Sequence, residues 1–262
     1  MSSVDLSIVI VTYNSQEEIV QVIKSILDAA KGIEFEIIIV DNDSSDQTIA
    51  RITDFSSTIK VIANSKNVGF GNANNQGFKI ATGNFILILN PDIILTTETR
   101  LKELCERLKS DNKIGIIAPR LTYPDGSVQE SVRGFPNIVV QLIRMVRADK
   151  IFINFRSYRD YMLMNKNLND EVYVDWVIGA FMLIRKDLLF EIGLFDKRYF
   201  MYMEDADLCL NLTKKGYRIC YSPQFSAIHS YKRESSKGFL STLKLTHIES
   251  SFKFYFKHGF WN

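Results

Sequence analysis

Apolar runs and amphipathic segments alternate along the first half of the chain. The apolar runs are short and rich in β-branched residues, and they lie at residues 6–12, 35–40, 59–63, 85–89 and 114–118. Such continuous runs are typical of strands that are buried on both faces, as in a parallel sheet. Between them apolar residues recur at helical spacing, first at Ile19, Val22, Ile23, Ile26 and Leu27. The alternation predicts a doubly wound, mostly parallel α/β sheet.

Local polar motifs predict where the first helices begin. Ser15-Gln-Glu-Glu18 has the pattern of a capping box, and Ser45 or Asp46 can cap the next short helix. The second half is less regular, and we expect a mobile loop at residues 156–169. The other elements expected there are helices at 139–153 and 186–192 and strands at 172–184 and 217–221.

Composition excludes several classes of protein. With 262 residues and 46% hydrophobic positions, the chain can form one large domain with a full core. The net charge of +2 includes no long basic run, so no nucleic-acid partner is expected. The longest apolar run, at residues 176–184, is shorter than the ~20 residues of a membrane helix. We therefore expect no integral membrane segment, although the chain can still lie on a bilayer.

Cysteine usage and the N-terminus indicate a cytoplasmic protein. Cys105, Cys209 and Cys220 are an odd number of thiols without CxxC spacing, which is typical of a reducing compartment. The start, Met1–Asp5, lacks the basic region of a signal peptide.

Polar residues directly follow several of the predicted strands, namely Thr12-Tyr13-Asn14, Asp41-Asn42 and Asn90-Pro91-Asp92. In a doubly wound sheet the ligand lies at the carboxyl ends of the strands, so we expect these residues to line one crevice. Asp41 can accept a hydrogen bond from a nucleobase or a ribose, whereas the alternative role of helix cap fits Asp46 better.

Asp92 is a candidate metal ligand. The proline before it makes a rigid turn, and its carboxylate suits Mg²⁺ or Mn²⁺ bridging a diphosphate. His229 is one of three histidines and can supply a second ligand. A single histidine is also common in a structural role, and both roles stay open for His229.

Gly69-Phe70-Gly71 matches only part of a dinucleotide-binding loop. Position 74 is Asn instead of the third glycine, and the loop follows the third predicted strand rather than the first. A Rossmann dehydrogenase is therefore not expected. The chain also has no GxxxxGK[ST] and no GxSxG motif, which excludes a P-loop and a nucleophile elbow on pattern.

Three acids, Glu204, Asp205 and Asp207, lie within four residues after an aromatic stretch. Acids in the first turn of a surface helix give the same pattern, because they favour the positive end of the helix dipole. The aromatic neighbours instead indicate a partly desolvated pocket, in which a carboxylate can act as a base. The choice depends on whether the upstream strand ends form a site that needs a base.

Together these motifs resemble those of family 2 glycosyltransferases, and within that family the bacterial rhamnosyltransferases of O-antigen and capsule assembly. The matching stretches occur in order at Val11–Asn14, Val40–Asp46, Asn67–Gly71, Leu89–Asp92 and Gly193–Cys209, followed by His229. The stretches at 131–133 and 175–176 have a weaker likeness.

The resemblance implies a GT-A fold, a sugar-nucleotide donor, a divalent metal ion and inversion at the anomeric carbon. Asp41 then matches the nucleobase contact, and Asp205 the general base. Asp92 is similar to the last, metal-binding acid of the DXD motif, and His229 to the histidine that completes the metal site. Many members have an acid where this chain has Asn90, which leaves Asp92 more of the metal's charge to balance.

Further contacts are expected on both sides of the reaction. The donor site is expected to include Thr12, Tyr13, Asn14, Asp41, Asn67, Gly69, Gly71, Asn90 and Arg133. Arg133 can pair with phosphate or simply lie on the surface. Trp176 can stack on an acceptor sugar or belong to the core, and Glu204 can bind the acceptor or serve as a helix acid. Asp207 is expected to be structural.

We therefore expect an inverting glycosyltransferase that transfers L-rhamnose from dTDP-L-rhamnose to a lipid-linked saccharide in cell-surface polysaccharide synthesis. One alternative is the same chemistry with another donor, such as a UDP-hexose. Another is a non-catalytic sugar-nucleotide-binding protein, against which the presence of both Asp92 and Asp205 argues.

The expected organisation has three parts. Residues 1–120 form the nucleotide-sugar-binding half and residues 121–235 the acceptor half of one domain, followed by an amphipathic tail at 236–262. The tail mixes phenylalanines with lysines, so it can pack as a helix on the domain. It can also lie on anionic headgroups at the inner face of the bacterial plasma membrane.

Overall fold

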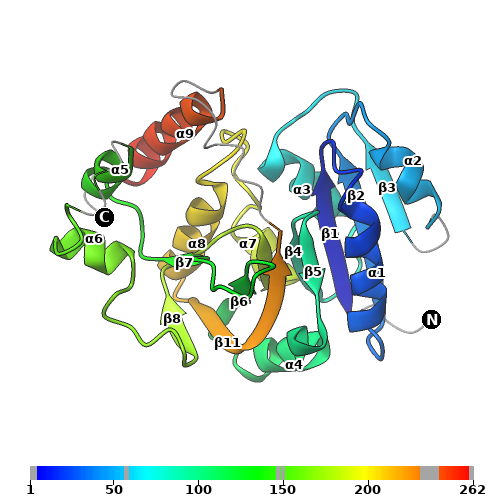
Figure 1. Ribbon diagram of the computed structural model, residues 1–262, viewed down its shortest axis with the longest axis horizontal. Helices are drawn as coiled ribbons and strands as arrows, with labels where there is room; N and C mark the ends of the chain where they lie inside the picture. Colours follow the sequence, from blue (N-terminus) through cyan, green and yellow to red (C-terminus); the bar gives the residue numbers. More distant parts are fainter. Residues whose placement is uncertain (1–4, 56–58, 146–147, 149–150, 231–241, 260–262) are drawn as a thin grey trace.

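The computed structural model describes residues 5–55, 59–145, 148, 151–230 and 242–259. Within these residues the strands are β1 (Leu6–Thr12), β2 (Phe35–Asp41), β3 (Ile59–Ala63), β4 (Phe85–Leu89), β5 (Ile93–Leu95), β6 (Ile114–Thr122), β7 (Val132–Arg133), β8 (Val172–Val174), β9 (Trp176–Val177), β10 (Phe181–Arg185) and β11 (Arg218–His229). Nine of them form one sheet in the order β3-β2-β1-β4-β10-β6-β11-β5, with β8 paired to β11 (Figure 1). Strands β7 and β9 form a separate pair.

Most of the paired residues in the large sheet lie in parallel pairs, although β5 and β8 also pair antiparallel with β11. Strands β3, β2, β1 and β4 are parallel neighbours, and β6 is parallel to β11. Strand β10 lies between these two groups and runs antiparallel to both β4 and β6. The predicted mostly parallel α/β sheet is therefore confirmed, and β10 joins its two parallel parts.

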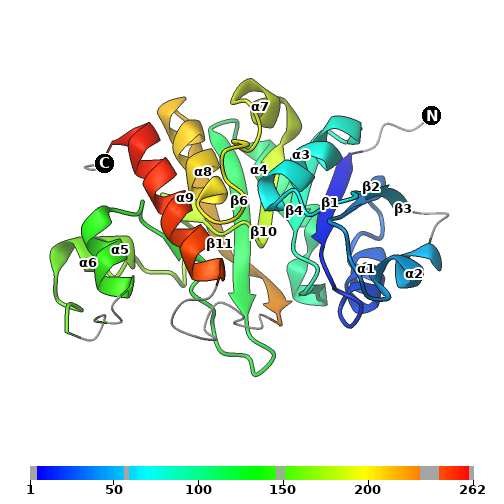
Figure 2. The ribbon, with the colours of Figure 1, turned by 90° about the horizontal axis from the view of Figure 1, so that it is seen from above.

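Helices cover both faces of the sheet (Figure 2). They are α1 (Ile19–Ala29), α2 (Thr48–Thr53), α3 (Phe70–Ile80), α4 (Leu101–Ser110), α5 (Ile138–Met145), α6 (Arg156–Tyr161), α7 (Lys186–Glu191), α8 (Glu204–Lys214) and α9 (Thr242–His258), with a 3₁₀ turn η1 (Thr97–Thr99). Successive side chains of a strand point to opposite faces. Ile8 and Ile10 of β1 therefore pack in the core with α1 and α4, whereas Val9 and Val11 pack in the core with α3 and α8.

Helices α5, α6 and α9 lie together at the end of the molecule opposite α2 and β3 (Figures 1 and 2). Phe254 and Tyr255 of α9 are buried against a cluster that includes Met203 and Leu210. The part of the expected tail at 242–259 thus packs on the domain, and its remaining residues, 236–241 and 260–262, lie outside the described ranges. Of the helices in those ranges, none has the length and hydropathy needed to cross a membrane.

Several local expectations are wrong. The capping box does not form, because the Ser15 N–H donates to Thr48 Oγ1 and leaves α1 to begin at Ile19 without a side-chain cap. Helix α6 lies where a loop is expected at 156–169, and α5 ends at Met145. The single run at 172–184 divides into β8, β9 and β10, since each pairs with a different partner. The cap expected from Ser45 or Asp46 does not form either: Gln47 is the N-cap of α2 and makes no side-chain cap hydrogen bond, while Asp46 Oδ1 accepts hydrogen bonds from the N–H and hydroxyl of Thr48.

Candidate active site

The ends of β1 and β2 meet at one edge of the sheet. Thr12 lies opposite Asp41 in the parallel register, and its hydroxyl donates to Asp41 Oδ1 at 2.8 Å. The hydroxyl and N–H of Ser44 donate to the same carboxylate at 2.6 and 2.9 Å. Asp41 is buried and shapes the turn after β2. Its contact with a nucleobase stays a prediction.

Asn14 ties the loops after β1 and β2 together. It has a positive φ of 52°, and its Oδ1 accepts a hydrogen bond from the Ser45 N–H at 2.9 Å. Its own N–H donates to Ser44 Oγ at 2.8 Å. Tyr13 lies between Thr12 and Asn14, whose positions are held by these hydrogen bonds, and it is 54% exposed. Its ring is therefore available at the carboxyl edge of the sheet.

The glycine loop before α3 supports the acidic segment. The Asn67 side chain accepts the Gly69 N–H at 2.9 Å, and the Phe70 N–H donates to the Phe200 carbonyl at 2.9 Å. A Cβ on Gly69 would lie 2.1 Å from that carbonyl oxygen, and one on Gly71 would lie 3.1 Å from Cβ of Phe195. Both glycines therefore allow residues 195–204 to pack on α3, a role that the sequence did not reveal. Their predicted contact with the donor is not tested by this packing.

Gly69→Ala is expected to lower the melting temperature and the rate of transfer together. The methyl group would displace the Phe200 carbonyl, and Ala at a φ of 86° adds about 1–3 kcal/mol of backbone strain. Gly126→Ala is the matched control, since it has a φ of 83° but nothing within 4 Å of the added methyl group. Thermal unfolding and initial rates check this. Equal effects of the two variants would contradict the proposed contact.

The backbone is strained directly before the acids. Tyr202 and Met203 have positive φ angles of 71° and 68°, and α8 begins at the next residue, Glu204. Such strain is concentrated at functional sites. It turns the chain so that Asp205 points toward the connection between β9 and β10, where the Gly179 N–H donates to its Oδ2 at 2.8 Å.

Asp205 is 91% buried, and its carboxylate is held by backbone groups. Oδ1 accepts the Ala206 N–H at 2.8 Å. Burial raises the pKa of Asp205, and the N–H groups of Gly179 and Ala206 oppose that shift, as does the nearby indole of Trp176. The indole N–H itself makes no regular hydrogen bond with a described residue. Asp205 is therefore positioned firmly and made more basic than an exposed aspartate.

Glu204 is the more strongly perturbed neighbour. It is only 5% exposed, and its Oε2 has no hydrogen-bond partner in the described part of the chain. Burial and the adjacent charge of Asp205 raise the pKa of Glu204 well above its usual range. Burial thus raises the pKa of both carboxyl groups, and the N–H groups of Gly179 and Ala206 oppose that shift at Asp205.

The connection at residues 178–180 links Asp205 to the turn that carries Asp92. Gly179 donates to Asp205, and the next carbonyl, that of Ala180, accepts the Asn90 N–H at 2.9 Å. Segments that are far apart in the sequence therefore meet at this connection. Gly179 and Ala180 are not among the predicted site residues, and two adjacent small residues within an apolar run were the available signal.

Asp92 and His229 lie side by side, as the sequence predicts. Pairing of β5 with β11 brings the end of β11 to the start of β5, and Asp92 Oδ1 is 3.2 Å from His229 Nε2. Gln129 Oε1 lies 2.6 Å from Nδ1 of the same ring and can accept a hydrogen bond from the Nδ1–H tautomer. In the neutral imidazole this leaves the lone pair of Nε2 beside the carboxylate of Asp92. Gln129 had no sequence signal, because only the fold brings it to the histidine.

The Asp92–His229 pair fits a divalent cation. In an octahedral site with bonds of ~2.1 Å, neighbouring ligand atoms are ~3.0 Å apart, close to the separation seen here. Gln129 supplies the outer hydrogen bond that typically orients a metal-bound histidine. In the described ranges no group of three or more His, Cys, Asp or Glu side chains could hold a metal. A cation here would need further oxygen ligands from a diphosphate or water.

Arg133 and Trp176 lie opposite each other in the β7–β9 pair. The Arg133 guanidinium is 3.2 Å from Glu130 and 5.6 Å from the Tyr161 ring centre, and its side chain is only 11% exposed. It is therefore not the surface arginine of the alternative interpretation. Trp176 packs among three core clusters, which favours its core role.

Asp207 has the structural role that the sequence predicts. It is buried, and its Oδ1 lies 2.7 Å from both Lys257 Nζ and His258 Nε2 of α9. These contacts fix α9 against the first turn of α8, which carries Glu204 and Asp205.

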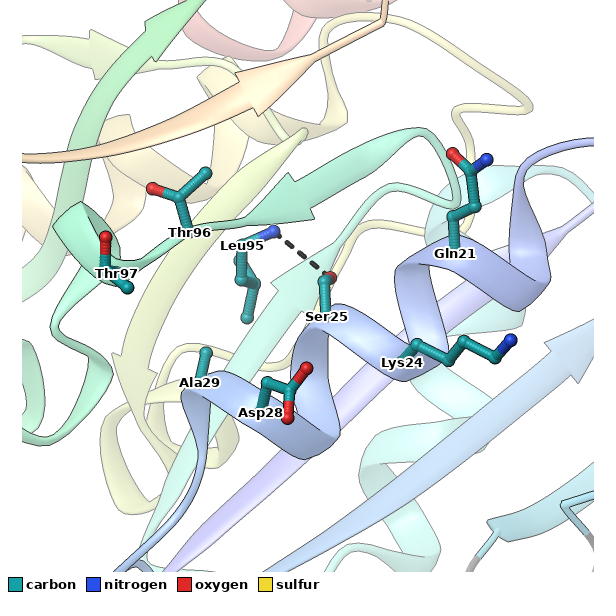
Figure 3. A pocket seen from close by; sticks show the side chains of 8 residues that line it. All are labelled: Gln21, Lys24, Ser25, Asp28, Ala29, Leu95, Thr96 and Thr97. Carbon is teal, nitrogen blue, oxygen red and sulfur yellow. Dashed lines mark hydrogen bonds between the residues drawn. The ribbon is translucent and has the colours of Figure 1, made fainter.

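A surface hollow of about 450 Å³ lies elsewhere, between α1 and the segment from β5 to η1 (Figure 3). The residues that line it are Gln21, Lys24, Ser25, Asp28, Ala29, Leu95, Thr96 and Thr97. None of the candidate residues above is among them. Its lining has no cluster of acids or other catalytic groups, so the carboxyl edge of the sheet is the better candidate site.

This fold, in which Asp41 and Asp92 lie at strand ends and Asp205 is bonded to the β9–β10 connection, is that of a GT-A glycosyltransferase. The chain belongs to glycosyl transferase family 2, whose family model matches residues 7–192. It is 31% identical over 197 residues to rhamnosyltransferase WbbL of Escherichia coli, covering 71% of this chain and 69% of that protein. The family resemblance and the assignment as an enzyme are thus confirmed.

Two further comparisons extend this result. The chain is 24% identical over 267 residues to the N-acetylglucosaminyl-diphospho-decaprenol L-rhamnosyltransferase of Mycobacterium tuberculosis, covering 98% of this chain and 86% of that protein. The structure of mannosyltransferase PcManGT from Pyrobaculum calidifontis with GDP-Man and Mn²⁺ superposes with a TM-score of 0.60 at 15% identity. It covers 87% of this chain and 57% of that one, a likeness that shows the fold alone.

Proposed function

We propose that this glycosyltransferase transfers L-rhamnose from dTDP-L-rhamnose to a lipid-linked saccharide in cell-surface polysaccharide synthesis. The observation that carries the proposal is Asp205, fixed by the Gly179 N–H next to the backbone that holds the Asn90–Asp92 turn. The names of the two relatives support the sugar, since both are rhamnosyltransferases. The second relative's name also supports a lipid-linked acceptor.

The proposed chemistry is a single displacement with inversion. The acceptor oxygen bonds to the anomeric carbon as the bond from that carbon to the diphosphate breaks, and Asp205 takes the acceptor proton. General base catalysis of this kind contributes about 10²–10⁴-fold. Asp92 and His229 would hold a divalent cation, which would neutralise charge on the departing diphosphate. No enzyme nucleophile is needed.

Glu204 has a supporting part in this proposal. In the proposed mechanism the proton of the pair is placed on Glu204, whose pKa is raised well above its usual range, and the charge on Asp205. A neutral Glu204 can donate a hydrogen bond to a sugar hydroxyl, and it leaves the pocket with one negative charge rather than two. The acceptor role predicted for Glu204 is consistent with its unpartnered Oε2.

A donor panel tests the function. The protein is incubated with dTDP-L-rhamnose, UDP-glucose or UDP-N-acetylglucosamine, with a lipid-diphosphate-linked N-acetylglucosamine as acceptor. Nucleoside diphosphate release is followed with Mn²⁺ and with EDTA. We expect release from dTDP-L-rhamnose only, and only with acceptor and metal, and a product of inverted anomeric configuration by NMR. Turnover of a UDP-sugar instead would replace the donor. Tight binding without any turnover would favour a binding protein.

We further propose that the enzyme works at the cytoplasmic face of the bacterial plasma membrane. A nucleotide sugar is dissolved in water, whereas the proposed acceptor is anchored in lipid. The reaction between them therefore needs an enzyme that reaches a bilayer surface.

A further inference from the structure

Residues 151–155, between α5 and α6, form a turn with large apolar side chains in solvent. Ile151, Phe152, Ile153 and Phe155 are 80%, 41%, 46% and 46% exposed. Single exposed apolar residues are ordinary on a protein surface. Four of them within five positions make a contiguous patch, and patches of this kind mark interaction surfaces.

Helix α9 adds a second apolar surface at the same end of the molecule. Its buried face includes Phe254 and Tyr255. A stripe on its opposite face is 36–78% exposed and consists of Leu245, Ile248, Phe252 and Phe256, at helical spacing. Both views place α9 beside α5 and α6 (Figures 1 and 2). An exposed apolar stripe on a helix whose other face is already buried is not typical of a surface that meets only water, and Glu249 is an exposed acid beside that stripe.

Positive charge lies next to the apolar turn. Arg156 and Arg159 are exposed and follow it directly, exposed Lys166 lies further along and donates to the Tyr173 carbonyl, and Asp160 is the only acid in residues 151–166. Asp160 is 3.7 Å from Arg156, an exposed pair that has little energetic weight. The turn therefore combines apolar side chains with a net positive flank, although the whole chain carries only +2.

We propose that the 151–155 turn, together with the exposed stripe of α9, docks on an anionic lipid bilayer. Apolar side chains enter the interface while the adjacent basic groups bind headgroup phosphates. A second copy of the chain is a poorer occupant, because a two-fold interface centred on the turn brings Arg156 and Arg159 close to their own copies. The inference rests on the proposed function only for its lipid-linked acceptor; exposure and charge carry the rest.

Vesicle flotation without any sugar nucleotide tests the docking surface. The wild-type protein is expected to float with vesicles of phosphatidylcholine and phosphatidylglycerol, and much less with phosphatidylcholine alone. Ile151→Ser with Phe152→Ser is expected to weaken binding at least about tenfold. Arg156→Gln with Arg159→Gln is expected to lower the affinity for anionic vesicles about fivefold for each charge removed, and to leave the affinity for phosphatidylcholine vesicles unchanged.

Two exposed apolar residues elsewhere give a matched control. Val61 of β3 and Phe190 of α7 are both 44% exposed, and Val61→Ser with Phe190→Ser is expected to bind vesicles as the wild type does. Thermal unfolding checks each variant, and Ile153→Ser with Phe155→Ser replaces the first pair if that pair unfolds.

Three results would overturn the proposal. They are wild-type protein that ignores anionic vesicles, serine variants that bind as well as the wild type, and a dimer in sedimentation that the serine variants dissociate while no vesicle binds. Since no donor is present, these results are independent of the identity of the transferred sugar.

Discussion

Asp205→Asn is expected to lower the rate of transfer by about 10²–10⁴-fold while donor affinity stays nearly unchanged. The asparagine has the shape of the aspartate, and its oxygen can still accept the Gly179 N–H, but its NH₂ group cannot accept the Ala206 N–H, so thermal unfolding is measured alongside to show that the variant is folded. It cannot take a proton from the acceptor hydroxyl. The rate is measured as nucleoside diphosphate release at saturating donor, and donor affinity by calorimetry.

Glu204→Gln is the matched contrast. The residue is adjacent, also buried and changed in the same way, but its pKa is raised well above the usual range and the proposed mechanism has the wild-type side chain neutral. Its rate is expected to fall within about tenfold, the size of one altered hydrogen bond. A full-rate Asp205→Asn enzyme, or equal losses in the two variants, would remove Asp205 from the role of base.

Asp92→Ala is expected to abolish the metal-dependent part of donor binding. Removing the carboxylate leaves His229 as the remaining protein ligand of the proposed cation, so donor affinity with Mn²⁺ should fall to its metal-free value. Removal of an outer hydrogen-bond partner of a metal ligand, here Gln129, typically lowers metal affinity about 10–100-fold. The loss in Asp92→Ala should be larger than that. Calorimetric titrations of the donor with and without Mn²⁺ measure the donor affinity in the two conditions.

Asp54→Ala controls for the loss of one negative charge, since Asp54 is exposed at the end of α2 and touches no candidate residue. Its titrations should match those of the wild type. A wild-type-like titration of Asp92→Ala would count against the metal role, and an equal loss in both variants would point to net charge rather than to coordination.

The central sheet could be predicted from the sequence because its strands are buried on both faces. Strands such as β1 and β2 then appear as continuous apolar runs, and polar residues at their ends stand out at once. The errors arose where local pattern and tertiary pairing differ. Residues 172–184 read as one strand, yet β8 pairs with β11, β9 with β7, and β10 with β4 and β6.

The candidate site could be predicted only in part, because some of its contacts depend on tertiary structure and leave no local pattern. Asp92 and His229 have local signals, and their predicted proximity is confirmed by the β5–β11 pairing. Gln129 and Gly179 contact the site through side-chain and backbone bonds that depend on the folded chain alone. The close approach of Gly69 to the Phe200 carbonyl is likewise a tertiary contact. A glycine in a motif typical of ligand-binding loops therefore has a packing role here.

Strand β10 has a consequence for how such an enzyme can be recombined. It belongs to the second half of the chain, yet it forms the antiparallel neighbour of β4, which belongs to the first. In a chimaera in which only residues 1–120 came from a relative, the relative's β4 would have to pair with β10 of this chain. The side chains at the β4–β10 interface would then have to be matched again. Exchange of whole halves is therefore disfavoured, and new specificity is more readily gained by altering the loops at the carboxyl edge.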